Sequence, residues 1–329
     1  MIPKRETRLP GWRAIVSLAA LSASALLAAC GGGTSQVQVF QPARVVVLGD
    51  ESSVIVDDGN ADGFKYSIND RTSTTAGKCQ ALPLYWQSVI TLYSFVVKEC
   101  NPTAAVAKAV VLAQPDARVE SPANGVARQI AQVSGGLGKT DLVTVMIGVN
   151  DIVALYEDAR DGRRTQAAAL AEAQRLGGVL ATAINGLLGS GARALVVTVP
   201  DMGVSPYAIN QEKTKAGAKA LLTQMSYEFN AILRTSIDQT SYDGRNYGLV
   251  LADDVVSAMA KAPTAFLASP YNATDAACTT ASVKDCTTAT LATGASFNSH
   301  LWASDRHLGP EAHRQIGLLA QSRAVNNPF

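Results

Sequence analysis

Charged and aromatic side chains are scarce in this sequence. Of its 329 residues, 17% are charged and 6% are aromatic, and 28 Lys and Arg against 27 Asp and Glu leave a formal net charge of +1. Because positive and negative charges are nearly equal in number, the composition indicates no strongly basic surface, which argues against nucleic acid as a partner. The hydrophobic content of 47% is enough to bury a large core, so most of the chain is not disordered. Charge alone therefore assigns no function.

Histidine and cysteine are few as well. The chain has three His and five Cys, and no spacing among them fits a zinc site, so we expect no metal. The sequence also lacks an internal period of about 20 to 50 residues, which argues against a solenoid or a propeller.

The N-terminus has no hydrophobic run long enough for a comfortable membrane span, but it has the pattern of an export signal. The uncharged run 14–29 ends in Ala28-Ala29-Cys30 and follows four basic residues, Lys4, Arg5, Arg8 and Arg13. Its end resembles the lipobox of bacterial lipoproteins. This resemblance implies cleavage after residue 29 and a diacylglycerol on the Cys30 thiol. We expect a signal peptide over 1–29, a lipidated tether over 30–43, and a cell-envelope lipoprotein, with the outer membrane favoured. The alternative is ordinary cleavage with Cys30 incidental.

The other four cysteines predict two disulfides, because they are an even set in an oxidising compartment. Of the three possible pairings, proximity in sequence favours Cys79–Cys100 and Cys278–Cys286. One helix over 81–97 would hold its ends about 25 Å apart, whereas a disulfide needs a Cα separation of about 4.4–6.8 Å. We therefore expect a helix near 82–92, followed by a strand at 95–97 that returns the chain to Cys79.

Apolar β-branched runs alternate with helical patterns along the rest of the chain. Their continuous apolar character is typical of strands that are buried on both faces, as in a parallel sheet. We expect strands at 44–48, 95–97, 142–147, 194–199 and 247–251, and helices at 164–189, 211–238, 254–261 and from Pro310 onward. This order predicts a single domain over 44–329, an α/β fold with a three-layer α/β/α sandwich around a central parallel sheet. Its ligand site is expected at the carboxyl ends of the strands.

Polar side chains stand where those strand ends would gather them. A serine follows the first strand, Gly148 and Asn150 follow the third, and Asp305 and His307 precede the last helix. Together they could supply a nucleophile, oxyanion donors, and a base with its orienting acid. The chemistry would be acyl transfer, with Ser52 attacking an ester carbonyl while His307 takes and returns the proton. The competing interpretation is that these residues only cap helices and turns.

The same segments resemble, in order, the SGNH or GDSL hydrolase family, especially its secreted bacterial lipase/esterase branch. Gly-x-Asn-Asp at 148–151 is the most specific match, and further matches are the segments 199–203, 228–230 and 307–313. The resemblance implies a serine esterase or lipase without a cofactor. Its substrate would be an acyl-ester small molecule, a lipid or an O-acylated glycan. We expect the insertions 53–80 and 262–300 to shape the cleft.

Three positions depart from the family's pattern. Glu51 stands where the family has its nucleophile, Asp116 stands where it has an oxyanion Gly, and Ser304 fills the slot of its Asp. Either the turn is shifted so that Ser52 reaches the site, or the nucleophile is lost. Asp305 could still orient His307 across a tighter loop. The alternative function is therefore a catalytically inactive SGNH-fold surface lipoprotein, acting as a binding or envelope module.

Overall fold

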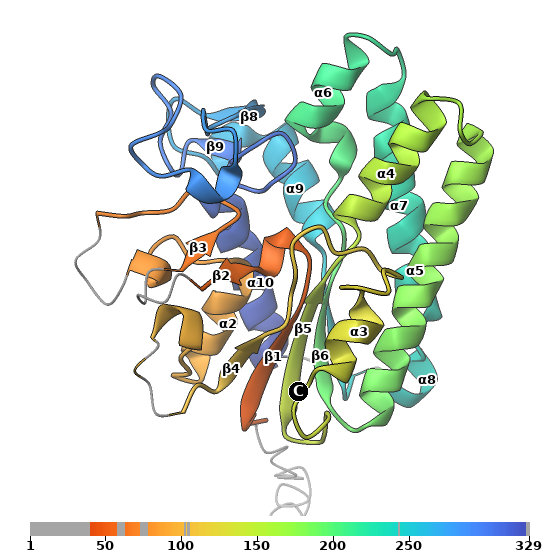
Figure 1. Ribbon diagram of the computed structural model, residues 1–329, viewed down its shortest axis with the longest axis vertical. Coiled ribbons are helices and arrows are strands. Elements are labelled where there is room, and N and C mark those ends of the chain that lie inside the picture. Colours follow the sequence, from red (N-terminus) through yellow and green to blue (C-terminus); the bar gives the residue numbers. More distant parts are fainter. Residues whose placement is uncertain are drawn as a thin grey trace, which may run out of the picture. The chain divides into compact units, whose positions relative to one another are not determined.

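A five-stranded parallel sheet forms the centre of the computed structural model (Figure 1). The structure describes residues 40–57, 63–72, 78–101, 103, 106–242 and 244–326. The signal peptide, Cys30 and most of the tether lie outside these residues, so the expectations about them stay predictions. The domain boundaries stay predictions as well.

The order of the sheet is β4-β1-β5-β6-β7, and all neighbours are parallel. The central strands β1 and β5 pair along their whole length, with Val46 opposite Val143, and their apolar side chains are buried. This burial on both faces explains the continuous apolar runs in the sequence. The strands are β1 Arg44–Gly49, β4 Ala109–Val111, β5 Asp141–Met146, β6 Arg193–Val197 and β7 Tyr247–Val250.

Helices cover both faces of the sheet, which confirms the predicted three-layer α/β/α sandwich (Figure 1). One layer contains α3 Val126–Ala131, α4 Val149–Arg160, α5 Gln166–Gly189 and α7 Ala218–Ser236. The other contains α2 Tyr85–Leu92, α9 Ala252–Lys261 and α10 Pro310–Asn326. The longest helix, α5, begins where the Thr165 side chain accepts a hydrogen bond from the N–H of Ala168, and its apolar stripe packs against α7.

Shorter elements connect the layers. Two small sheets lie outside the main one: an antiparallel pair, β2 Ile55–Val56 with β3 Phe64–Lys65, and a parallel pair, β8 Asn272–Ala276 with β9 His300–Trp302. The remaining α-helices are α6 Pro206–Glu212 and α8 Gln239–Tyr242. The 3-10 helices are η1 Glu51–Ser53, η2 Lys78–Gln80, η3 Lys98–Cys100, η4 Met202–Val204, η5 Pro263–Ala265 and η6 Val283–Asp285.

Both predicted disulfides are present. The Cα atoms are 5.2 Å apart in Cys79–Cys100 and 5.7 Å apart in Cys278–Cys286. The expected strand at 95–97 is wrong, however. Val97 forms only an isolated bridge to Ala109, and the edge strand is β4. The return towards Cys79 is made by a turn after α2 and by η3. A run of three apolar residues was therefore not enough to predict a strand here.

Two helix predictions also differ from the structure. The segment 211–238 holds the end of α6 and a separate helix, α7, because the chain turns at Gly217 with φ of 87°. A helix after the strand at 142–147 was expected only under the interpretation that Asn150 and Asp151 cap it near Ile152, whereas α4 begins directly at the end of β5, with Gly148 at its N-cap. That abrupt start puts Asn150 in the first turn of a helix.

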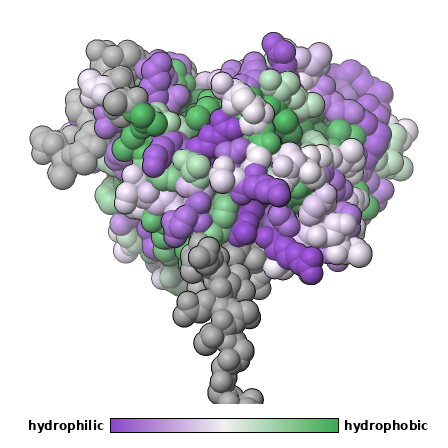
Figure 2. Space-filling model, turned by 90° about the horizontal axis from the view of Figure 1, so that it is seen from below, coloured by the Kyte–Doolittle hydropathy of each residue, from purple (hydrophilic) through white to green (hydrophobic). Residues whose placement is uncertain are grey.

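None of the helices in the described ranges is long and apolar enough to cross a membrane. The face drawn in Figure 2 mixes hydrophilic and hydrophobic residues.

Candidate active site

Three segments that are distant in sequence meet at the carboxyl end of the sheet. Glu51 follows β1, Asn150 follows β5, and His307 lies in the loop between β9 and α10. Two glycines allow the chain to turn sharply at the first two of these places. At Gly49, with φ of 147°, a Cβ would lie 2.2 Å from the carbonyl oxygen of Met146. A side chain at Gly148, with φ of 133°, would meet the packed core behind the site.

A cavity of about 590 Å³ opens at this place. It brings together Asn150, Asp305 and His307, three of the residues that the sequence predicted for the site. Ser52 and Gly148 are not among the described residues that line it, whereas Glu51 is. Both long insertions contribute to its wall, through Tyr66 and through the loop closed by the Cys278–Cys286 disulfide, which supports the expectation that they shape the cleft.

The carboxylate of Glu51 is held by two donors. The backbone N–H of Asp116 donates to Oε1 at 2.7 Å, and the side-chain amide of Asn150 donates to Oε2 at 2.8 Å. Glu51 is only 7% exposed. A backbone N–H and an Asn amide that converge on one point are the donors expected to bind the oxyanion of an acyl transfer. Here both of them already bind a carboxylate of the chain itself.

Asp116 reaches this arrangement through its backbone. Its φ is 55°, the left-handed region that glycine adopts without strain, which accounts for the Gly expected at this place. The exposed side chain of Asp116 lines the cavity, while its N–H faces Glu51. The N–H group thus keeps an oxyanion donor in position even though the side chain is a carboxylate.

Of the two serines of η1, Ser52 is held through its backbone and Ser53 through its hydroxyl. Asp50 caps the turn, since its Oδ1 accepts from the N–H of Ser52 at 3.1 Å. The hydroxyl of Ser53 is buried and bonds the hydroxyl of Tyr85 at 3.0 Å. A shift of the turn that would bring Ser52 into the cavity is not present, because Glu51 occupies that place. A catalytic role of Ser52 stays a prediction.

Burial changes the titration of the carboxyl group beside Glu51. Asp50 is 1% exposed, and its Oδ2 has no hydrogen-bond partner among the described residues. This burial, together with the nearby charge of Glu51, raises the pKa of Asp50 to about 8. The carboxyl group is therefore mostly protonated at neutral pH.

His307 is bonded to a serine and not to an aspartate. Its Nδ1 lies 2.6 Å from Oγ of Ser304, and that hydroxyl also donates to Oδ1 of Asp305 at 3.3 Å. The contact between Asp305 and His307 runs through Ser304, while the Asp305 carboxylate also pairs with Arg306, so direct orientation of His307 by Asp305 stays a prediction. Burial lowers the pKa of His307, and the carboxylates of Glu51 and Asp305 oppose this shift.

Two buried basic side chains, Lys65 and His313, are not among the described residues that line the cavity. Lys65 donates through Nζ to the carbonyl oxygens of Cys79 and Leu82, at 3.2 and 3.0 Å, and to that of Ala81. Burial lowers the pKa of Lys65 to about 7, although these acceptors favour its charged form. Burial also lowers the pKa of His313 to about 3, so this histidine is neutral and structural, as the sequence indicated.

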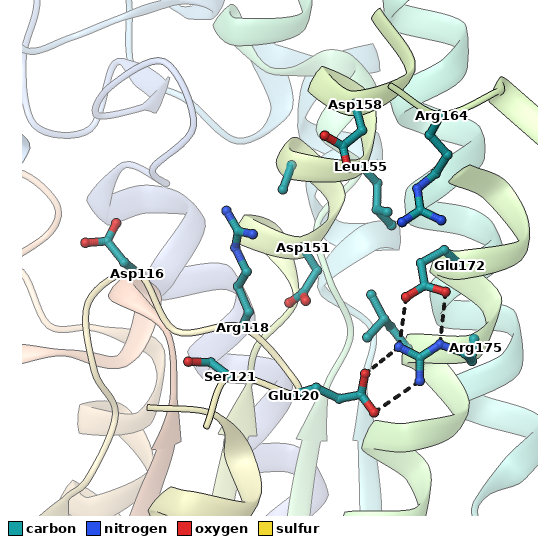
Figure 3. A pocket seen from close by; sticks show the side chains of 12 residues that line it. Asp116, Arg118, Glu120, Ser121, Asp151, Leu155, Asp158, Arg164, Glu172 and Arg175 are labelled. Atoms are coloured by element: carbon teal, nitrogen blue, oxygen red, sulfur yellow. Dashed lines mark hydrogen bonds and ion pairs between the residues drawn. The ribbon is translucent and has the colours of Figure 1, made fainter. Parts of the chain in front are cut away.

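A second cavity, of about 550 Å³, lies on the other side of the Asp116 loop, between the loop and helices α4 and α5 (Figure 3). Arg175 lies at one end of it, opposite Asp116: its Nη1 bonds Oε1 of Glu120 at 3.1 Å, and its Nε bonds Oε2 of Glu172 at 2.9 Å. Oδ2 of Asp151 accepts from the N–H of Val119 at 3.0 Å, and burial raises the pKa of Asp151 to about 6. The buried bond to Asp151 anchors the loop that carries the Asp116 donor, whereas the ion pair of Arg175 with Glu120 is exposed to solvent.

The part of the chain that the structure describes contains no cluster of three or more His, Cys, Asp or Glu suited to a metal ion. The groups gathered at this cavity are the backbone N–H of Asp116, the side-chain amide of Asn150, a partly buried imidazole and several carboxylates. A three-layer α/β sandwich with these groups at its strand ends has the organisation of an ester hydrolase.

The chain belongs to the GDSL-like lipase/acylhydrolase family of carboxylic ester hydrolases, whose pattern matches residues 45–319. No curated protein matches the chain. Among solved structures, it is similar to a catalytic mutant of an acetylxylan esterase from Geobacillus stearothermophilus, with 12% identity, a TM-score of 0.46, and coverage of 88% of this chain and 96% of that one. It is also similar to phospholipase A1 from Streptomyces albidoflavus NA297, with 14% identity, a TM-score of 0.41, and coverage of 86% and 99%.

Proposed function

We propose that this member of the family binds an acyl-ester ligand in the 590 Å³ cavity without forming an acyl-serine intermediate. The observation that carries the proposal is the Glu51 carboxylate, which accepts hydrogen bonds from both oxyanion-type donors, the N–H of Asp116 and the amide of Asn150. A substrate carbonyl cannot use these donors while Glu51 holds them. A carboxylate is also no substitute for a serine hydroxyl in acyl transfer.

The hydroxyl groups near the site support the same proposal. Ser52 does not line the cavity among the described residues, and the hydroxyl of Ser53 is bonded to Tyr85. Ser304 lies on the Nδ1 side of His307, away from the Nε2 atom that would accept a nucleophile's proton. None of these hydroxyls is therefore in position for attack.

A serine esterase that works through Ser52 remains the second candidate. It is favoured by Asn150, Asp305 and His307, which line one cavity and would serve as oxyanion donor, orienting acid and base. Attack by Ser52 would require the turn after β1 to rearrange so that Glu51 leaves the donors. The ligand classes are the same for both candidates: an acyl-ester small molecule, a lipid or an O-acylated glycan.

The test is covalent labelling of the full-length chain with a fluorophosphonate probe, together with hydrolysis of p-nitrophenyl acetate. We expect neither in the wild type nor in Ser52→Ala. Labelling and turnover are expected in Glu51→Ser, which returns a hydroxyl to the slot beside the two donors. Labelling of the wild type that Ser52→Ala abolishes would overturn the proposal in favour of the serine esterase. Unchanged thermal melting of both variants is the folding control.

Binding is tested separately, by titrating the wild type with short-chain acyl esters and following the melting temperature. A ligand that binds only the folded chain raises this temperature with concentration. Tyr66→Ala, which removes part of the cavity wall, should weaken the shift, and Tyr227→Ala, an exposed residue outside this cavity, should not. Ester titration without any shift would contradict the binding function.

We also propose that the chain is a lipoprotein of the cell envelope, anchored through Cys30, with the outer membrane favoured. The support is the sequence of residues 1–33 alone. Metabolic labelling with a palmitate analogue should mark the wild type and not Cys30→Ala, and membrane fractionation should find only the labelled form in the membrane. Labelling that survives in Cys30→Ala would refute the anchor.

A further inference from the structure

We infer that Ser304 is a positioning residue that links the Asp305 carboxylate to His307 and keeps Nε2 of His307 unprotonated towards the cavity. The inference rests on the proposed function, since it concerns the same site. It goes further because it treats the His307 side of that site as complete and only the nucleophile as missing.

The argument is a count of protons around Oγ of Ser304. This hydroxyl has one proton, and the Asp305 carboxylate at 3.3 Å can only accept. If the Ser304 proton points to Asp305, the 2.6 Å contact with His307 needs a proton from Nδ1. This is the arrangement in which both contacts are hydrogen bonds.

Two backbone N–H groups also point to Oγ of Ser304: those of Arg306 and His307, at 3.4 and 3.3 Å. A hydroxyl oxygen has two lone pairs, and in this arrangement the short contact with Nδ1 uses one of them, so the two long contacts share the other. The proton of the hydroxyl is then left for the carboxylate, and Ser304 passes the orienting effect of Asp305 across one residue.

The tautomer decides what His307 can do. With the proton on Nδ1, the lone pair of Nε2 can take a proton from a nucleophile. In Glu51→Ser, the new hydroxyl would give its proton to Nε2 while its oxygen bonds the ester carbonyl carbon. The alcohol would then leave with that proton, and water would repeat both steps to release the acid. With the proton on Nε2, the first transfer is blocked.

The direct test is the ¹⁵N NMR spectrum of histidine in the full-length chain, with the His307 signals assigned from His307→Ala. The wild type should show the tautomer protonated on Nδ1. In Asp305→Asn the new amide can donate to Ser304, so the population should shift at least tenfold towards the tautomer protonated on Nε2. Ser282→Ala, which changes a hydroxyl of the same cavity, should leave it unchanged. A wild type protonated on Nε2, or an Asp305→Asn spectrum equal to the control, overturns the inference.

Activity in the Glu51→Ser background gives a second readout. Loss of the orienting group should lower kcat by about 10³- to 10⁴-fold with little change in KM, as expected when the wrong tautomer dominates. Ser304→Ala should show this loss and Ser304→Asp should restore the rate. Equal kcat values in Ser304→Ala and its parent would overturn the relay. Fluorophosphonate labelling of the wild type would instead overturn the proposed function, and the NMR spectrum would still decide the role of Ser304.

Discussion

Asp50 should make the chain less stable as the pH rises, and Asp50→Asn should remove that effect. The carboxyl group is buried, and its pKa is raised from about 3.8 to about 8. Between these values the unfolded chain has lost the proton and the folded chain retains it, so the free energy of unfolding falls by about 1.4 kcal/mol per pH unit. From pH 5 to pH 7 this amounts to about 3 kcal/mol. An Asn keeps the acceptor for the N–H of Ser52 without a titrating group.

The assay is urea unfolding of both chains at pH 5, 6 and 7. The difference between the two free energies isolates Asp50 together with its interaction with the charge of Glu51, because the remaining titrating groups are shared. The variant should exceed the wild type by about 3 kcal/mol more at pH 7 than at pH 5. Asp285→Asn, a change to an exposed carboxylate, is the matched control and should give a constant difference. A constant difference for Asp50→Asn would refute the account of this buried acid.

Three further changes test the geometry around the site by urea unfolding. Asp116→Gly should stabilise the chain by about 1 kcal/mol, because φ is 55° there, and a loss of stability would contradict the strain. Gly148→Ala should destabilise it by about 2–4 kcal/mol, because the new Cβ would lie 2.7 Å from Val199 Cγ2, and wild-type stability would contradict that packing. Glu51→Gln should cost about 1–3 kcal/mol, because its NH₂ group must face one of two donors. Glu157→Gln is the control, because the Glu157 carboxylate accepts from the hydroxyl of Tyr207, and this change should alter the free energy of unfolding little. An equal loss of stability in Glu51→Gln and Glu157→Gln would refute the two-donor arrangement at Glu51.

The layers of the fold could be predicted because parallel strands buried on both faces leave long apolar runs. The expected strands at 44–48, 142–147, 194–199 and 247–251 all correspond to observed strands. The run at 95–97 is equally apolar but much shorter, and its neighbourhood is fixed by a disulfide and a turn. A run of three residues does not distinguish a strand from an extended connection.

The members of the site could be predicted, but their contacts could not. Asn150 and His307 were found because they stand after strands whose ends must meet. The bond from Asp116 to Glu51 depends on a left-handed backbone at a residue that is not glycine. The Gly that the family has at this position indicated such a backbone, but the Asp gave no reason to expect that it is kept. Ser304 was visible as the residue in the aspartate slot. That it would contact both Asp305 and His307 depends on how tightly the loop turns.

Positions 51 and 304, where this chain departs from the family's pattern, are linked through charge. The resemblance to the family implies a hydroxyl at position 51 and a carboxylate at position 304, and this chain has them the other way round. Around His307 the chain thus has Glu51 and Asp305, both of which favour its protonated form against the effect of burial. Ser304→Asp alone would add a further carboxylate and pull a proton onto the base, whereas Glu51→Ser removes one and frees the two donors. Because Ser304 already connects Asp305 to the imidazole, the nucleophile slot is the position whose reversal opens the site to an ester.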